Sequence, residues 1–180
     1  MPQFRDPYFK FSVVVPEHWK FLPPAWSPME QMKRALGPEE LIQFASKPFC
    51  CAMSHHESDR HAFPTLQITA RPFQVPSNDQ AKEILDAQIR AISDQHLDFE
   101  LDWSTHEAIV SGFRANMIKG SFVILTQPND EIFEIGVISR SYTVFTHWHA
   151  FTIGLSSSDH ANYYSEHDFT NIINSVRIDG

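Results

Sequence analysis

A short stretch of the sequence gathers side chains that bind transition metals. Cys50 and Cys51 are adjacent, and His55, His56 and His61 follow them. Thiolate sulfur and imidazole nitrogen are preferred ligands of zinc and copper, so a loop that brought these groups together would hold one ion. The spacing matches no zinc finger, because no C-x-x-C pair is present, and an exposed polar loop beside two buried thiols explains the same residues. We therefore expect no cofactor, with zinc or another transition metal as the alternative.

Aromatic and methionine side chains form a second group of candidate binding residues. They are Trp19, Phe21, Trp26, Met29 and Met32. Such side chains make adaptable contact surfaces, although they also fill ordinary cores. His147 and His149 would share one face of a strand, about 7 Å apart, where they line an apolar pocket, share a ligand or form a buried pair. We predict a binding patch from both sets, and a change in tryptophan fluorescence when a partner binds.

The charge of the chain limits its partners. There are 14 Lys and Arg against 22 Asp and Glu, a net charge of −8, and no basic cluster. Nucleic acids and anionic membranes need a basic surface, so neither is an expected partner. Asp98, Glu100 and Asp102 share one face of a predicted strand, which suits a cation or a basic partner. A solvated face that guards an edge strand against aggregation explains the same pattern.

Motifs of the common enzyme classes do not occur in the sequence. It has no Gly-rich phosphate loop, no G-x-S-x-G nucleophile elbow and no H-E-x-x-H zinc helix. These absences favour a non-catalytic protein without excluding every enzyme class. The two adjacent cysteines give no disulfide framework, and no apolar leader precedes the first strand. We therefore expect a cytoplasmic protein, or a periplasmic one if a signal peptide was removed.

Hydrophobic periodicity predicts the elements that position these residues. Alternating apolar residues predict strands over 9–15, 41–46, 65–73, 98–103, 112–125, 132–138 and 142–155. Helical spacing predicts helices over 29–36, over 79–95 and from Ser165 to the region of Val176, each beginning at a capping residue. The segment 47–64 breaks this rhythm and reads as a long loop or an irregular edge hairpin, inserted into the domain.

The order of these elements predicts the fold class. Short turns connect the later strands, so most pairing should be antiparallel. Strands alternate with a few amphipathic helices that must bury their apolar faces against a sheet. We predict an α+β fold, a mostly antiparallel sheet covered by helices in an α/β/α sandwich, as a single domain over residues 1–180.

Three sequence segments resemble the PsbP-like superfamily. The first strand runs into Val15-Pro16-Glu17-His18-Trp19, which is similar to that family's P-x-x-W. Residues 63–69, Phe-Pro-Thr-Leu-Gln-Ile-Thr, resemble its central P-S-L-x-I strand, and residues 169–176 resemble its closing F-x-x-I-I-x-S helix. The superfamily includes the PsbP protein of photosystem II, the Ran-binding Mog protein, DcrB lipoproteins and the adaptor chaperones of type VI secretion. The resemblance implies a PsbP-like fold and, because its members are mostly binding modules or assembly factors, a low prior for catalysis.

Three hypotheses of function follow from these observations. The preferred one is a non-catalytic binding module, or an assembly or adaptor protein, that engages a protein segment or a small apolar ligand. The second is a metal-binding protein or a metal-dependent enzyme that uses the His-rich loop 55–61. The third is a structural subunit of a larger assembly, for which a homodimer is one form.

Overall fold

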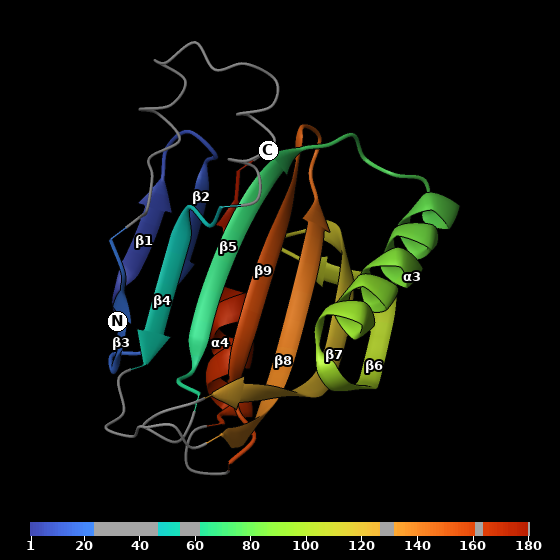
Figure 1. Cartoon of the computed structure of the whole chain (residues 1–180). Coiled ribbons are helices and arrows are strands. Elements are labelled where there is room, and N and C mark those ends of the chain that lie inside the picture. The colour runs from blue at the N-terminus through green and yellow to red at the C-terminus, as the bar shows by residue number, and fades with distance from the viewer. Residues whose placement is uncertain (24–46, 55–61, 127–131, 161–163, 180) are drawn as a thin grey trace.

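A seven-stranded antiparallel sheet forms the centre of the molecule, with the strand order β3-β4-β5-β9-β8-β7-β6 (Figure 1). The computed structural model describes residues 1–23, 47–54, 62–126, 132–160 and 164–179. The strands of this sheet are β3 (Trp19–Phe21), β4 (Cys50–Ser54), β5 (Thr65–Pro72), β6 (Leu97–Val110), β7 (Phe113–Thr126), β8 (Phe133–Phe145) and β9 (His149–Ser158). A smaller sheet joins β1 (Gln3–Asp6), β2 (Phe11–Val14) and β10 (Arg177–Ile178) in the order β1-β2-β10.

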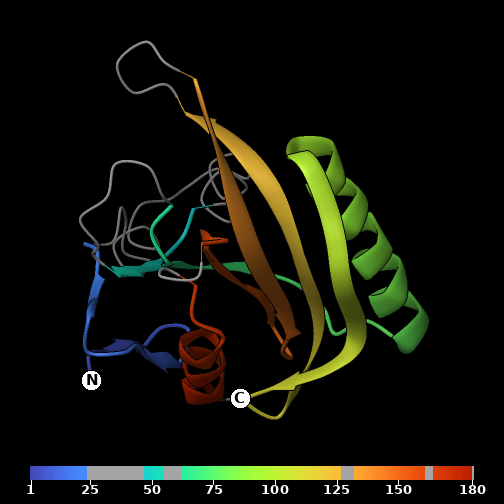
Figure 2. The ribbon, with the colours of Figure 1, turned by 90° about the horizontal axis from the view of Figure 1, so that it is seen from below.

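The two described helices cover opposite faces of the large sheet. Figure 2 shows α3 (Asn78–Gln95) against one face of the large sheet. The helix α4 (Glu166–Ser175) and the small sheet lie against the opposite face. Side-chain hydrogen bonds attach α3 to its face: the Asn116 amide donates to the Ala81 carbonyl at 2.9 Å, and the Gln88 amide donates to the Thr143 hydroxyl at 2.7 Å. These layers confirm the predicted α+β sandwich. Within the described residues, neither helix is long and apolar enough to span a membrane.

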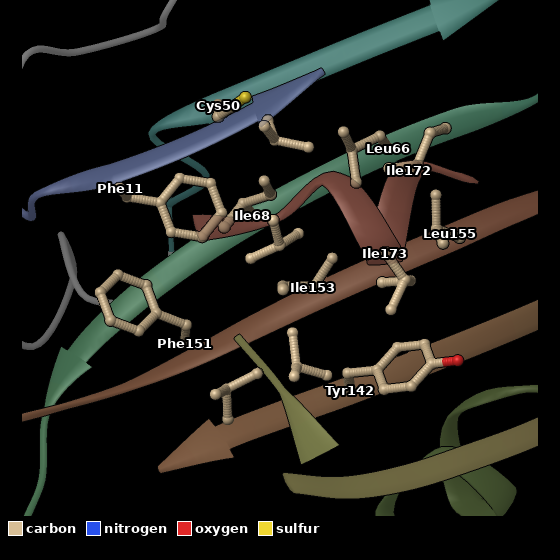
Figure 3. Packing of buried hydrophobic residues seen from close by; sticks show 14 of the residues in the cluster. Phe11, Cys50, Leu66, Ile68, Tyr142, Phe151, Ile153, Leu155, Ile172 and Ile173 are labelled. Atoms are coloured by element: carbon tan, nitrogen blue, oxygen red, sulfur yellow. The ribbon is translucent and has the colours of Figure 1, made fainter. Parts of the chain in front are cut away.

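The main core lies between the large sheet and the layer formed by α4 and the small sheet. Alternate residues of β5 and β9 point into it, and α4 covers it on the side away from the large sheet (Figure 3). Its central side chains are at most 1% exposed: Phe11, Leu66, Ile68, Phe151, Ile153, Leu155 and Ile172. Burying one such side chain contributes about 1.5–3 kcal/mol, so this cluster contributes substantially to stability.

Capping residues set the start of both helices, as the sequence predicts. The Ser77 hydroxyl accepts a hydrogen bond from the Gln80 amide, and the Gln80 side chain accepts one from the Ser77 amide, which completes a capping box. The Ser165 hydroxyl accepts from the Asp168 amide in the same way. The helix predicted over 79–95 is therefore confirmed, and Ser77 is its cap.

One predicted strand proves to be two. Residues 142–155 are not continuous, because a tight turn reverses the chain after Phe145. Thr146 fixes this turn: its hydroxyl donates to the His149 carbonyl at 2.8 Å, and its amide donates to the same carbonyl at 2.9 Å. The prediction failed because the turn contains no Gly or Pro and aromatic residues flank it on both sides. His147 and His149 therefore do not share a strand face.

A second correction concerns the segment 47–64, which is predicted as a long loop or an irregular edge hairpin. It contains the regular strand β4, which forms an antiparallel pair with β5 on one side and with β3 on the other, so β4 is not the edge of the sheet. The first and last of its residues are buried, and it continues the core across the sheet. The predicted strand 41–46 and the predicted helix over 29–36 lie outside the described residues.

The third correction concerns the alternation predicted for β6. The register between β6 and β7 shifts at three places, and at each one β6 carries one residue more than β7. Leu101 pairs with Gly120 and Trp103 pairs with Lys119, so these two apolar side chains lie on opposite faces of the sheet. Gly120 allows the close approach, because a Cβ there would lie 2.6 Å from the Glu100 carbonyl oxygen.

Candidate binding site

A small cleft lies where the chain leaves β5 and enters α3. It has a volume of about 360 Å³. Its walls come from the connection Phe73–Pro76 and from one side of α3, where Gln80, Glu83 and Ile84 line it. Apolar and polar side chains line it about equally: Phe73, Val75, Pro76 and Ile84 are apolar, and Gln74, Gln80 and Glu83 supply two amides and one carboxylate. This combination is typical of sites that bind an apolar group and fix its orientation with a few polar contacts.

Contacts from three elements hold Phe73 at the wall of the cleft. Its amide donates to the Trp148 carbonyl at 3.1 Å. Its ring packs on Phe145 with centroids 5.7 Å apart, and the Arg71 guanidinium lies 5.3 Å from its centroid. The β8–β9 turn is thus attached to the connection that forms the cleft, and the two lie side by side at the same end of the sheet (Figure 1).

The β8–β9 turn presents an unusually exposed tryptophan. The Trp148 side chain is 78% exposed, and Val75 on the cleft wall is 52% exposed. Large apolar side chains with this exposure lose contact with water only when a partner covers them. The sequence offered no signal for the exposure of Trp148, because neighbouring aromatic residues made the segment resemble a buried strand.

The predicted histidine pair is divided between two environments. His147 is exposed in the turn, with its ring centroid 6.4 Å from that of Phe113. His149 is half-buried and packs edge-on against Phe9, with centroids 5.3 Å apart. Burial lowers the pKa of His149, because the charged imidazolium loses its water. His149 therefore belongs to the rim of the core, and His147 belongs to the exposed turn.

The carboxylate of Glu83 is the acidic group of the cleft. Glu83 is exposed, and within the described residues no Lys or Arg forms an ion pair with it. The nearest acidic residues along this side of α3 are Asp79, four residues earlier, and Asp86, three residues later. A cation on a ligand would find an accessible counter-charge here. The sequence predicted that Glu83 lies on a helix. Hydrophobic periodicity could not show that the connection Phe73–Pro76 lies close to that helix.

The first group of predicted patch residues lies elsewhere. Trp19 is 1% exposed and fills the core, where its indole has no surface to offer. Phe21 is half-buried and packs on Phe4, with centroids 5.8 Å apart. Trp26, Met29 and Met32 lie outside the described residues. The structure therefore does not bring Trp19 to the cleft at which His147 and Trp148 are exposed.

The cysteines of the predicted metal site point to opposite faces of β4. Cys50 pairs with Ile68 and is buried in the core, whereas Cys51 pairs with Gln67 on the other face. Burial raises the pKa of the Cys50 thiol, which disfavours the thiolate that a metal needs. His55, His56 and His61 lie outside the described residues. The residues that the structure does describe contain no cluster of three metal-ligating side chains.

A charge network between buried Arg140 and half-exposed Glu166 ties α4 to the sheet and was not predicted. The Arg140 guanidinium, whose side chain is 9% exposed, donates to the Glu166 carboxylate at the start of α4. The Tyr164 hydroxyl donates to the same carboxylate. Burial and this hydrogen bond raise the pKa of Tyr164 to about 12. The network balances the charge of Arg140 within the protein, so we assign it a structural role.

Comparison with known proteins supports the fold. No protein-family model and no curated protein matches the chain. Among solved structures, LpqN of Mycobacterium tuberculosis, described as involved in cell envelope biogenesis, is similar with a TM-score of 0.59 and 13% identity, over 95% of this chain and 84% of that one. A protein of Bacteroides thetaiotaomicron is similar with a TM-score of 0.50 and 11% identity, over 99% of this chain but 48% of that one. At these identities the likeness shows a related fold and nothing of function.

Proposed function

We propose that this protein is a non-catalytic binding module that engages a segment of another protein at the cleft between Phe73–Pro76 and α3. The observation that carries this proposal is the cleft beside an exposed tryptophan, with Val75 and Trp148 52% and 78% exposed. Exposed aromatic side chains next to a pocket are typical of the central contacts of protein interfaces.

The size and charge of the cleft define the occupant. A volume of about 360 Å³ is near the lower end of the range for small-molecule sites, which suits one inserted side chain better than a whole cofactor. Glu83 supplies a negative charge at the wall. We propose a segment that places one aliphatic side chain in the cleft and a Lys or Arg beside Glu83.

The fold comparison is compatible with this class of function. LpqN has a similar fold and is described as involved in cell envelope biogenesis, and by analogy of fold we propose a role in that process for this chain, as a non-catalytic binding module. Membership of the PsbP-like superfamily, on the three resembling segments, is part of the same proposal.

Methyl NMR with two short peptides tests the proposal. The first probe is acetyl-Gly-Gly-Leu-Lys-Gly-Gly-amide, and the second replaces its Lys by Glu. We expect the Lys peptide to shift the methyl signals of Val75 and Ile84 and the Glu peptide to bind more weakly. Glu83→Lys should reverse this preference, because it reverses the charge at the cleft wall.

Two variants of α3 provide the matched control. Ile84→Ala removes a cleft wall and should weaken binding of the Lys peptide, whereas Ile89→Ala changes a half-buried isoleucine of the same helix that does not line the cleft. Equal loss in both variants, or saturation with no shift at Val75 and Ile84, would show that the cleft is not the binding site.

A further inference from the structure

The edge strand β6 is the second exposed apolar surface of the protein. Within the described part of the chain no strand lies beyond β6, so the outward backbone groups of this 14-residue strand lack a ladder partner. Large apolar side chains are exposed along it by 44–66%: Leu97, Leu101, Trp103 and Ile109. Edge strands of this length pair readily with another extended chain.

The charge of β6 is entirely negative. Its acidic side chains are all exposed: Asp98, Glu100, Asp102 and Glu107. No Lys or Arg occurs between Arg90 and Arg114, so the strand carries no cation of its own. On the neighbouring strand, Lys119 pairs with Trp103 and is half-buried, which leaves the outer edge acidic.

This charge decides between two kinds of occupant. If β6 paired with β6 of a second copy, the acidic side chains of both strands would face one another, and two chains of net charge −8 would be joined. Like charges on paired strands destabilise the pairing. A partner strand with Lys or Arg opposite these acidic side chains forms ion pairs with them, and it also covers the exposed apolar side chains.

We propose that β6 docks an extended segment of a partner protein in which apolar residues alternate with Lys or Arg. The segment lies along the outer edge and adds a strand to the sheet. Trp103 lies on the α4 face of the sheet and Leu101 lies on the α3 face. The docked segment therefore contacts apolar side chains on both faces.

The register shifts of β6 give this surface its selectivity. The pairing with β7 is regular over Trp103–Thr105 and Ala108–Val110, with a shift between them. Backbone pairing on the outer edge is therefore confined to short stretches, and side-chain contacts must supply the remaining affinity. Bulges and acidic residues exclude indiscriminate strand pairing, whereas a basic segment of matching pattern overcomes both.

Labelled peptides of defined pattern test this proposal on the whole protein. The probe is an octapeptide that alternates Val and Lys, and two controls replace its Lys by Glu or methylate alternate backbone amides. We expect the Val-Lys peptide to bind with an affinity that falls as salt is raised. It should also slow hydrogen exchange of amides within 97–110. The Val-Glu and methylated peptides should bind at least about tenfold more weakly.

Exposed-residue variants separate β6 from the cleft. Trp103→Lys and Ile109→Lys should each weaken binding of the Val-Lys peptide. Trp148→Lys, at a tryptophan beside the cleft that is more exposed than Trp103, should leave this binding unchanged. Equal weakening by Trp148→Lys, equal binding of the Val-Glu peptide, or a dimer in which β6 amides are protected without peptide would each overturn the proposal. Because β6 does not line the cleft, either proposal can fail while the other holds.

Discussion

His149 lies where the aromatic core meets the surface. Its ring packs edge-on against Phe9 and lies 6.1 Å from the ring of Phe151, between centroids. A neutral imidazole suits these neighbours, whereas an imidazolium would be deprived of water, and burial therefore lowers the pKa of His149. The folded state thus binds a proton at this site less readily than the unfolded chain, whose histidine pKa is about 6.5.

The consequence is a predicted loss of stability in mild acid. As pH falls below about 6.5, the unfolded chain takes up a proton before the folded protein does, so the free energy of unfolding decreases until the lower folded pKa is passed. We expect His149→Phe to flatten this slope, as measured by urea unfolding between pH 5 and pH 7.5. His147→Gln, in the exposed turn, is the matched control, and an equal change in both variants would assign the slope to another group.

At the level of elements, the start of α4 depends on one charged contact. The hydrogen bond from Arg140 lowers the pKa of Glu166, and Tyr164 donates to the same carboxylate. Removing Glu166 would leave the buried guanidinium without a counter-charge. Because the Glu166 side chain is 53% exposed, water screens part of this effect.

Glu166→Gln should destabilise the protein by about 1–2 kcal/mol at neutral pH, after discount for screening. The folded pKa of Glu166 lies below its unfolded value of about 4.3, so the stabilisation is present above that pH and lost as pH falls through the folded pKa. Wild type and variant should therefore converge in acid, which urea unfolding at pH 3 and pH 7 can measure. Glu107→Gln, an exposed acid on β6, serves as the control, and a difference at pH 3 as large as that at pH 7 would contradict the ionic explanation.

The capping box of Ser77 and Gln80 links the start of α3 to the cleft, because Gln80 belongs to both. Ser77→Ala removes the acceptor of the Gln80 amide and should lower the free energy of unfolding by about 1 kcal/mol. Because Gln80 also lines the cleft, the same change should weaken the Leu-Lys peptide. Ser77→Thr keeps the hydroxyl and should restore both properties, as thermal unfolding and peptide titration can show. Full stability in Ser77→Ala would contradict the role of the cap.

Local signals explain which elements the sequence predicts. The helices of Ser77 and Ser165 begin at caps and carry apolar stripes, so both were predictable from short-range chemistry. The turn at Thr146 depends on hydrogen bonds that leave no trace in composition, and the register shifts of β6 depend on its pairing with β7. Trp148 was visible in the sequence, but its exposure is a property of the turn.

For the whole molecule, long-range pairing determines what the sequence leaves open. The antiparallel pairing of β6 with β7 and of β7 with β8 follows chain order and could be predicted. The β8–β9 hairpin was missed because its turn lacks a sequence signal, and the contact of β5 with β9 joins distant segments. That contact brings the end of β5 beside the β8–β9 turn, and so the cleft arises only in the folded molecule. The predicted fold class is confirmed, while a site formed by such contacts requires the structure.

The small sheet also governs the order in which the molecule can fold. β2 lies between β1, next to it in the chain, and β10, close to residue 180. The Val14 amide and carbonyl both bond to the Ser175 hydroxyl at 2.9 Å, across 161 positions. During synthesis, the Val14–Ser175 bonds and the pairing of β2 with β10 can therefore form only after α4 has been made, and their formation closes a long loop, which is slow. Until then the nascent chain keeps apolar surface open to water, and this interval is when it most needs protection from aggregation.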